Sequence, residues 1–131
     1  MKTFLDDNFM LSNETSIRLY HDYAKDMPIM DYHCHLSPQE IYDNKPFTNL
    51  TEAWLYGDHY KWRAMRANGI DEKFITGHSD VSDYDRFLYW VKTLPSAVGN
   101  PIYHWSHLEL QRFFGVYDLI NEANAPVIWN K

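Results

Sequence analysis

The chain has 131 residues, with 12 Lys and Arg against 18 Asp and Glu, a formal net charge of −6 and an isoelectric point near 5.5. That length suits one domain, and a hydrophobic fraction of 45% supplies enough apolar side chains for a core, which argues against global disorder. A complete eight-stranded β/α barrel needs roughly 250 residues, so if the residues point to a barrel enzyme, a chain of this size holds only part of it.

Composition also indicates which kinds of binding partner and which cellular compartment are compatible with the sequence. An acidic chain without a Lys/Arg cluster gains nothing from counterion release, which argues against a nucleic-acid partner. The longest apolar run, 87–91, is far shorter than the roughly 20 residues of a membrane span, and Asp6 and Asp7 stand where a signal-peptide core would begin. A single cysteine fits a reducing cytoplasm. We therefore expect a cytoplasmic protein without a membrane partner.

The first elements in chain order are a helix and a strand. Ser12 or Asn13 is a suitable cap for a first helix, which ends by Pro28. Residues 29–35 then predict a short strand, because apolar and β-prone residues lie between Pro28 and the helix start at Ser37.

The rest of the chain is predicted to be mainly helical. Helix starts are indicated by capping side chains at Ser37 with Glu40, Asp58, Ser82, and Ser106 with Glu109. The corresponding ends are expected at Pro46, Asn68-Gly69, Pro95 and Gly115, with residues 99–101 as a loop. A last helix begins near Pro126 and the chain stops at Lys131, which leads us to expect a truncated sequence.

The sharpest chemical motif is the H-x-H of His33 and His35 in the predicted strand. Residues two apart on a strand share a face, so both imidazoles can converge on one metal ion while Cys34 points the other way. The pair stands at the C-terminal end of the strand, where α/β barrels place their active sites. The motif by itself also occurs as two ordinary histidines, and Cys34 is a weak candidate nucleophile.

Three other groups of polar residues each allow both a functional and a purely structural interpretation. His104 and His107 are a rival metal pair, although they straddle a predicted helix start and capping or packing roles are favoured. The segment 58–63 crowds polar side chains at a helix N-terminus, which suits an anion or a developing oxyanion but is also typical of a solvated turn. Arg63 and Arg66 share a helical face that can hold a carboxylate, or they lie simply at the surface.

Four segments form a specific combination of motifs: 31–38 (DYHCHLSP), 58–66 (DHYKWRAMR), 75–77 (ITG) and 99–110 (GNPIYHWSHLEL). Together they resemble the N-terminal part of the uronate isomerase (glucuronate isomerase) family, within the amidohydrolase or metal-dependent hydrolase superfamily. The similarity extends over essentially all 131 residues, in order and with matching spacing. An H-x-H alone would be shared with the wider superfamily.

For the fold, the resemblance implies the α/β class and the N-terminal fragment of a TIM barrel of metal-dependent-hydrolase type. The fragment itself is expected to be mostly α-helical with one barrel strand near 29–35. Its expected parts are residues 1–36, with the N-terminal helix and the first barrel strand, and residues 37–131, a mainly helical insertion region that is truncated.

For the function, the resemblance implies an aldose–ketose isomerase of bacterial hexuronate catabolism. Such enzymes convert D-glucuronate to D-fructuronate and D-galacturonate to D-tagaturonate through an enediolate. His33 and His35 match the family's strand-one ligands of a divalent metal ion, Zn²⁺ with Mn²⁺ as the alternative. His59 and Tyr60 match active-site residues that also contact the substrate, with Tyr60 in proton transfer. Arg63 is our further candidate for binding the sugar acid.

The barrel strands that would follow, with a late metal-binding Asp and substrate-binding Arg residues, are absent from this sequence. We therefore expect the 131-residue chain to be inactive alone and to bind metal weakly, since two histidines fall short of the usual three protein ligands. Two other classes stay open: a metal-dependent hydrolase and a non-enzymatic helical binding module. Homo-oligomerisation is open as well.

Overall fold

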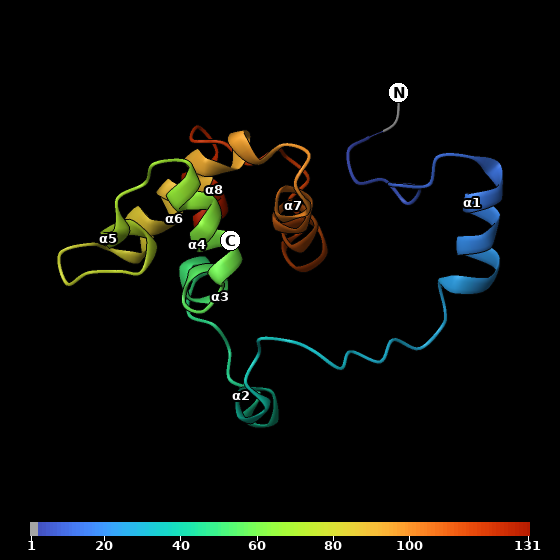
Figure 1. Cartoon of the computed structure of the whole chain (residues 1–131), viewed down its shortest axis with the longest axis horizontal. Helices are drawn as coiled ribbons and strands as arrows, with labels where there is room; N and C mark the ends of the chain where they lie inside the picture. Colours follow the sequence, from blue (N-terminus) through green and yellow to red (C-terminus); the bar gives the residue numbers. More distant parts are fainter. Residues whose placement is uncertain (1–2) are drawn as a thin grey trace. The chain divides into compact units, whose positions relative to one another are not determined.

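The computed structural model describes residues 3–131, and its regular secondary structure in that range is helical throughout. The chain divides into two compact units, Met1–Cys34 and His35–Lys131, which are described separately below. Figure 1 shows α1 in the first unit and α2 to α8 in the second. The expected barrel architecture has no counterpart among these described elements.

The described part of the first unit, residues 3–34, contains α1 (Glu14–Leu19), which continues as the π-helical stretch η1 (Tyr20–Ala24). Asn13 provides the predicted cap: its side-chain oxygen accepts from the backbone N–H of Ser16 at 2.9 Å, while Ser16 Oγ accepts from the Asn13 N–H at 3.2 Å. None of residues 3–34 is buried. The order here comes from local hydrogen bonds and not from a hydrophobic core.

The strand predicted at 29–35 is wrong, because no strand forms anywhere in residues 3–131. Ile29, Met30 and Tyr32 are 92%, 90% and 99% exposed. A strand satisfies its backbone groups only through a neighbouring strand, and residues 3–131 provide no such partner. The apolar pattern was read correctly as β-prone, but pairing decides whether a strand exists.

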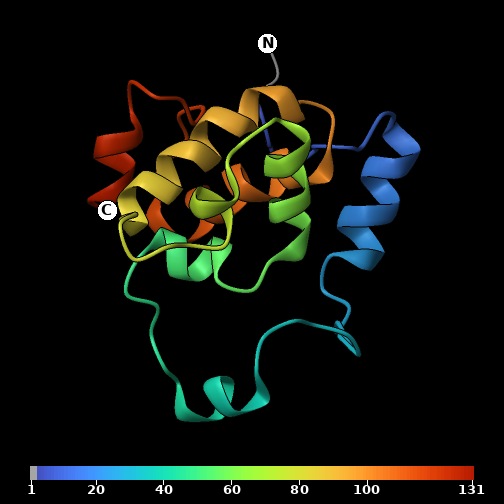
Figure 2. The same cartoon turned by 60° about the vertical axis from the view of Figure 1, so that its left-hand side comes forward.

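The second unit packs around α6 (Asp83–Thr93), which contacts α3 (Leu50–Leu55), α4 (His59–Ala67), α5 (Glu72–Ile75) and α8 (Ala125–Trp129). Figures 1 and 2 both show these helices gathered about α6. The helices η2 (Leu94–Ala97) and α7 (Pro101–Phe114) follow α6 in the chain and contact each other. The hydrophobic core comprises Trp54, Leu55, Met65, Ile75, Phe87, Trp90, Val91, Leu94, Ile102, Leu110, Val116, Ile120, Ala125 and Ile128.

Helix α6 occupies the centre because its sequence is apolar along one side. Phe87, Trp90, Val91 and Leu94 recur at spacings of three and four residues, and all are at most 1% exposed. Its start is also well specified, since Ser82 and Asp85 form a reciprocal capping box. Burial of each such side chain contributes about 1.5–3 kcal/mol, which makes this helix the main source of stability.

Several predicted helix boundaries are confirmed and one is wrong. Asp58 caps α4, Gly115 ends α7 in the left-handed conformation at φ +64, and α8 begins at Ala125. The capping box predicted at Ser106 does not form. Helix α7 instead begins at Pro101, capped by Asn100, and Ser106 lies inside it with its hydroxyl donating to the carbonyl of Ile102 at 3.0 Å.

Helix α2 (Pro38–Asp43) contributes no side chain to the hydrophobic core. Ser37 precedes it, but its side chain makes no capping hydrogen bond, so the capping box expected with Glu40 is absent. Asn44 ends the helix at φ +49, before Pro46 as expected. No residue of α2 is buried. The helix therefore depends on local signals alone.

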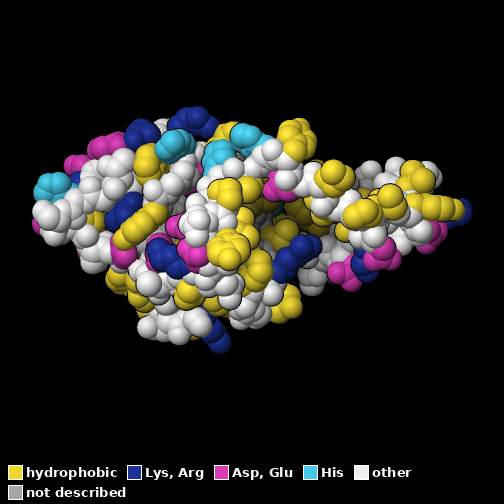
Figure 3. Space-filling view, turned by 90° about the horizontal axis from the view of Figure 1, so that it is seen from below, with side chains coloured by type: hydrophobic (Ala, Val, Ile, Leu, Met, Phe, Trp, Pro, Cys, Tyr) yellow, Lys and Arg dark blue, Asp and Glu magenta, His cyan; other side chains and the backbone are white. Residues whose placement is uncertain are grey.

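The described surface mixes charged and apolar side chains. On the face shown in Figure 3, basic and acidic groups alternate with exposed hydrophobic groups, and no area of that face carries charge of only one sign. Among residues 3–131, no helix has the length and apolar character needed to cross a bilayer.

Candidate functional site

The N-terminus of α4 holds most of the predicted site residues, and Asp58 fixes its geometry. One Asp58 carboxylate oxygen accepts from the backbone N–H groups of Tyr60 at 2.9 Å and Lys61 at 3.2 Å. The other oxygen accepts from Lys61 Nζ at 2.6 Å. Burial by itself would raise the pKa of Asp58, but the hydrogen bonds and charge of Lys61 outweigh it and hold that pKa below its ordinary value.

This cap changes what the helix terminus can bind. One of the two interpretations of segment 58–63 was that its backbone N–H groups bind an anion or a developing oxyanion. In the structure the Asp58 carboxylate already accepts from two of them, and Lys61, 7% exposed, neutralises that carboxylate. The Asp58 cap therefore favours the other interpretation, in which this terminus is not an open anion site.

Three predicted residues form a row beside this terminus. The His35 ring stacks on the Tyr60 ring, with centroids 6.1 Å apart and planes 20° apart. The Arg63 guanidinium carbon lies 4.4 Å from the centroid of the Tyr60 ring. The Tyr60 side chain is 53% exposed. This His35–Tyr60–Arg63 row places an imidazole, a phenol and a guanidinium side by side at an accessible surface.

The remaining polar side chains of α4 point elsewhere. The His59 ring lies against the Trp62 ring, with centroids 4.8 Å apart. Arg66 Nε donates to Glu72 at 2.8 Å and its Nη2 pairs with the second Glu72 oxygen, which raises the pKa of Arg66 through that hydrogen bond. The shared carboxylate clamp of Arg63 and Arg66 is therefore not formed: Arg66 already binds a carboxylate.

The metal ligands predicted at His33 and His35 fall on either side of the division between the two units, so their mutual geometry is not described. His33 is exposed, and its backbone N–H donates to the Asp31 carboxylate at 3.1 Å. Across residues 3–131, no three His, Cys, Asp or Glu side chains gather as a metal site would require. Imidazoles suit Zn²⁺ and Mn²⁺ in kind but are too few in number here to complete a site.

The rival pair His104 and His107 is a packing feature. Both lie within α7 and do not straddle its start. His107 Nδ1 lies 2.7 Å from the Tyr103 carbonyl, and its Nε2 accepts from the backbone N–H of Ile120 at 3.0 Å. Both ring nitrogens are thereby used, with the hydrogen on Nδ1, and burial lowers the pKa of His107. The expected packing role is confirmed for His107, whereas His104 is only partly buried.

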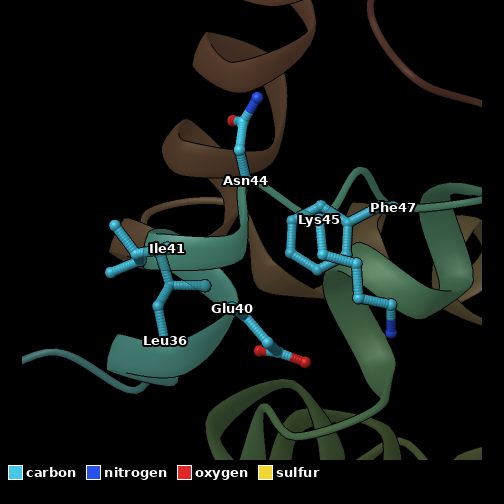
Figure 4. Close-up of a pocket in the computed structure, with 6 residues that line it drawn as sticks. All are labelled: Leu36, Glu40, Ile41, Asn44, Lys45 and Phe47. Atoms are coloured by element: carbon cyan, nitrogen blue, oxygen red, sulfur yellow. The ribbon is translucent and has the colours of Figure 1, made fainter.

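Neither Cys34 nor the hollow beside α2 supports a further functional role. Cys34, expected on a packed strand face, is exposed. A hollow of about 240 Å³ beside α2 contains no predicted site residue; Figure 4 shows the side chains that line it, Leu36, Glu40, Ile41, Asn44, Lys45 and Phe47. It therefore gives no support to the predicted chemistry.

Two features of the site were missed. The bond between Asp58 and Lys61 has a sequence signal, because opposite charges three residues apart meet on a helix. The stacking of His35 on Tyr60 has none, since α2 and α3 separate the two residues in the chain. Only the folded arrangement brings them together.

Comparison with known proteins identifies the wider group. Residues 1–131 match the glucuronate isomerase family. The uronate isomerases of Clostridium acetobutylicum and Caldanaerobacter subterraneus subsp. tengcongensis are 66% and 63% identical over all 131 residues, which span 28% of each relative. A crystal structure of uronate isomerase from Thermotoga maritima matches 98% of the chain, and 28% of its own, at a TM-score of 0.89 and 39% identity. The chain belongs to the glucuronate isomerase family.

Proposed function

We propose that this chain is the N-terminal part of a uronate isomerase that converts D-glucuronate to D-fructuronate and D-galacturonate to D-tagaturonate in hexuronate catabolism. The observation that carries the proposal is the His35–Tyr60–Arg63 row within a chain at least 63% identical to two uronate isomerases. The alternatives, a hydrolase or a non-enzymatic helical module, lack comparable support.

The chemistry of the row suits the reaction. Aldose–ketose conversion moves a proton from C2 to C1 through an enediolate, so it requires a proton carrier and a donor to the developing oxyanion. The Tyr60 hydroxyl supplies such a donor, and the Arg63 guanidinium lies 4.4 Å from the centroid of its ring. Arg63 offers N–H groups to the sugar-acid carboxylate, and His35 is placed to orient the substrate beside Tyr60. His59 remains a proposed substrate contact, although its ring lies against Trp62.

A divalent metal, Zn²⁺ or Mn²⁺, is part of the proposal through His33 and His35. The two imidazoles are suitable donors, but the remaining ligands would have to come from outside residues 3–131. When bound, such an ion would hold and polarise substrate oxygens. No step of the mechanism above depends on it.

The proposal includes the expected barrel architecture. Residues 29–35 are exposed and β-prone, which suits a first barrel strand that forms only when partner strands are present. A cytoplasmic location is supported by the low cysteine content, a single Cys in 131 residues, which suits a reducing compartment. The 131-residue chain by itself is proposed to be inactive, and homo-oligomerisation remains part of the hypothesis for the longer protein.

A chimera tests the proposal. This chain would replace the matching segment of the Clostridium acetobutylicum uronate isomerase, and the conversion of D-glucuronate and D-galacturonate would be measured. We expect an active enzyme whose kcat falls about 10²–10⁴-fold with Tyr60→Phe, because the proton-transfer group is lost. Arg63→Met should mainly raise KM, because it removes a ground-state contact.

Matched controls are Tyr117→Phe and Arg112→Met, exposed residues outside the row, which should leave both constants unchanged. A folded chimera that cleaves amides or esters and does not isomerise uronates would support the hydrolase class instead. Conversion of D-glucuronate by the isolated 131-residue chain, free of host enzyme, would contradict its proposed inactivity.

A further inference from the structure

A polar hollow of about 340 Å³ lies beside α6, in a part of the second unit that the proposed isomerase chemistry does not use. It is bordered by Tyr56 after α3, by residues of the loop from α5 to α6, and by Asp83 and Arg86 of α6. Figure 1 shows this loop in yellow, next to α5. The volume falls in the range of small-molecule sites, about 300–1,000 Å³.

Arg86 is the unusual group in its wall, because its guanidinium is buried and incompletely hydrogen-bonded. The side chain is 5% exposed. Nη2 donates to the carbonyls of Ile75 at 2.7 Å and Leu55 at 3.4 Å, so it binds the ends of α5 and α3. Among the described residues, Nε has no hydrogen-bond partner, and Nη1 has only the Asp83 carboxylate at 3.7 Å, beyond hydrogen-bond length. Nε is fully buried, which leaves Nη1 as the donor that a ligand in the hollow can satisfy.

Gly77 leaves Nη1 accessible from the hollow. A Cβ at this position would lie 3.3 Å from Nη1, and the backbone there adopts φ +95, which side chains rarely tolerate. The loop thus brings bare backbone, and no side chain, up to the guanidinium.

Asp83 provides an acceptor next to this donor. Its carboxylate accepts from Asn49 Nδ2 at 2.9 Å and from the Tyr56 hydroxyl at 3.2 Å, and it retains further lone pairs. The charges of Arg86 and Asp83 nearly cancel, and the His78–Asp80 pair at the rim brings a further carboxylate. An anion is therefore disfavoured, whereas a hydroxyl group both accepts and donates, as the pair requires.

We propose that this hollow binds a neutral polyhydroxylated ligand the size of a monosaccharide. One hydroxyl oxygen accepts from Arg86 Nη1, and a hydroxyl of the same ligand donates to the Asp83 carboxylate. This site is separate from the His35–Tyr60–Arg63 row. The proposal that it binds such a ligand does not depend on the proposed isomerase function.

Titration of the full chain with D-glucose, followed by ¹H–¹⁵N NMR, tests the site. We expect saturable shifts of the Gly77 amide and of the Arg86 Nε–H resonance, with a dissociation constant of roughly millimolar order for so small a ligand. Tetrahydropyran has the same ring without hydroxyls and should shift neither resonance. D-glucuronate should bind more weakly than D-glucose, because its carboxylate meets Asp83 and Asp80.

Variants separate recognition from folding. Asp83→Asn keeps the side-chain shape and should weaken D-glucose binding about five- to tenfold, because a charge-assisted hydrogen bond becomes a neutral one. Asp118→Asn, the same change at an exposed residue, should leave binding unaltered. Arg86→Lys should abolish binding; if circular dichroism shows that this variant does not fold, Asp83→Asn decides.

Four results would overturn the proposal: no saturable shift at Gly77 or Arg86, equal shifts with tetrahydropyran, tighter binding of D-glucuronate than of D-glucose at these resonances, or unchanged binding by Asp83→Asn. Shifts confined to Tyr60 and Arg63 would likewise place sugar binding elsewhere.

Discussion

Two segments that carry proposed site residues differ in how they acquire structure. Residues 29–35 have no regular secondary structure, and their apolar side chains are almost fully exposed. The start of α4 is ordered by Asp58, whose carboxylate binds two backbone N–H groups and the Lys61 ammonium. A helix obtains its hydrogen bonds from its own neighbours in sequence, whereas a strand needs a partner that may be far away in the chain. The comparison shows why one half of the site is formed here and the other is not.

Hydrogen exchange should show the largest contrast. The amides of Trp90 and Val91 lie in the fully buried part of α6 and should exchange at least about 10³-fold more slowly than an unstructured chain. The amides of residues 29–35 should exchange near the unstructured rate. Exchange resolved by NMR gives both values, and strong protection of residues 29–35 would mean that the segment is paired after all.

Matched aromatic deletions test the same contrast in stability. Trp90→Ala should lower the free energy of unfolding by about 3–5 kcal/mol, because it leaves a cavity at the centre of α6. Tyr32→Ala should change it by less than about 0.5 kcal/mol, since that side chain is 99% exposed. Chemical denaturation provides the comparison. A similar loss for both variants would contradict the division into a packed and an unpacked region.

Removing the predicted cap side chains of α4 and α2 should have a smaller effect on the free energy of unfolding. Asp58→Ala should lower the free energy of unfolding by about 1–3 kcal/mol, because it removes a cap and deprives the buried Lys61 of its carboxylate. Ser37→Ala should have almost no effect, since the Ser37 side chain makes no capping bond. Thermal unfolding followed by circular dichroism measures both. If Ser37→Ala is the more damaging change, the assignment of the caps is wrong.

The smallest effect is the pH dependence from His107. The pKa of His107 is lowered in the folded chain, whereas in the unfolded chain it is near 6.5. As the pH falls below 6.5, His107 therefore takes up a proton in the unfolded chain before it does so in the folded chain. The contribution of His107 to the free energy of unfolding is therefore complete above pH 6.5. It is lost as the pH falls towards the pKa of the folded chain, by at most about 1.4 kcal/mol per pH unit.

His107→Gln serves as the reference for this pH effect, since an amide can accept from Ile120 without titrating. The difference in unfolding free energy between the two chains should shrink as the pH falls from 7.5 to 5. A constant difference over that range would show that His107 does not titrate in this way.

Local signals explain which parts of the fold were predictable. Asp58, Ser82 and Gly115 act through bonds to residues at most five positions away, and the predicted helix boundaries at these residues are confirmed. For the first helix the structure selects Asn13 from the two predicted candidates, Ser12 and Asn13. The start of α7 was misplaced because both Asn100 and Ser106 can cap a helix, and local sequence does not rank them. Burial of Ile102 explains why the earlier start is preferred.

The candidate site was only partly predictable for the same reason. Its residues, His33, His35, His59, Tyr60 and Arg63, were identified from motifs and from the family resemblance, and their roles remain proposals. Their distribution was not predicted: His59 lies against Trp62, whereas Tyr60 lies between His35 and Arg63. Arg86 was not identified at all, because an arginine in an amphipathic helix is expected at the surface.

The sequence by itself determined the family, the mainly helical character of residues 37–131 and several helix ends, since these depend on motifs and on hydrogen bonds between near neighbours. Helices α3 and α5 were not predicted. The tertiary structure decided that residues 29–35 form no strand, that the His35 ring stacks on Tyr60, and that Arg86 is buried beside a polar hollow. Each of these depends on groups distant in sequence or on whether a partner is present, and no local pattern encodes that.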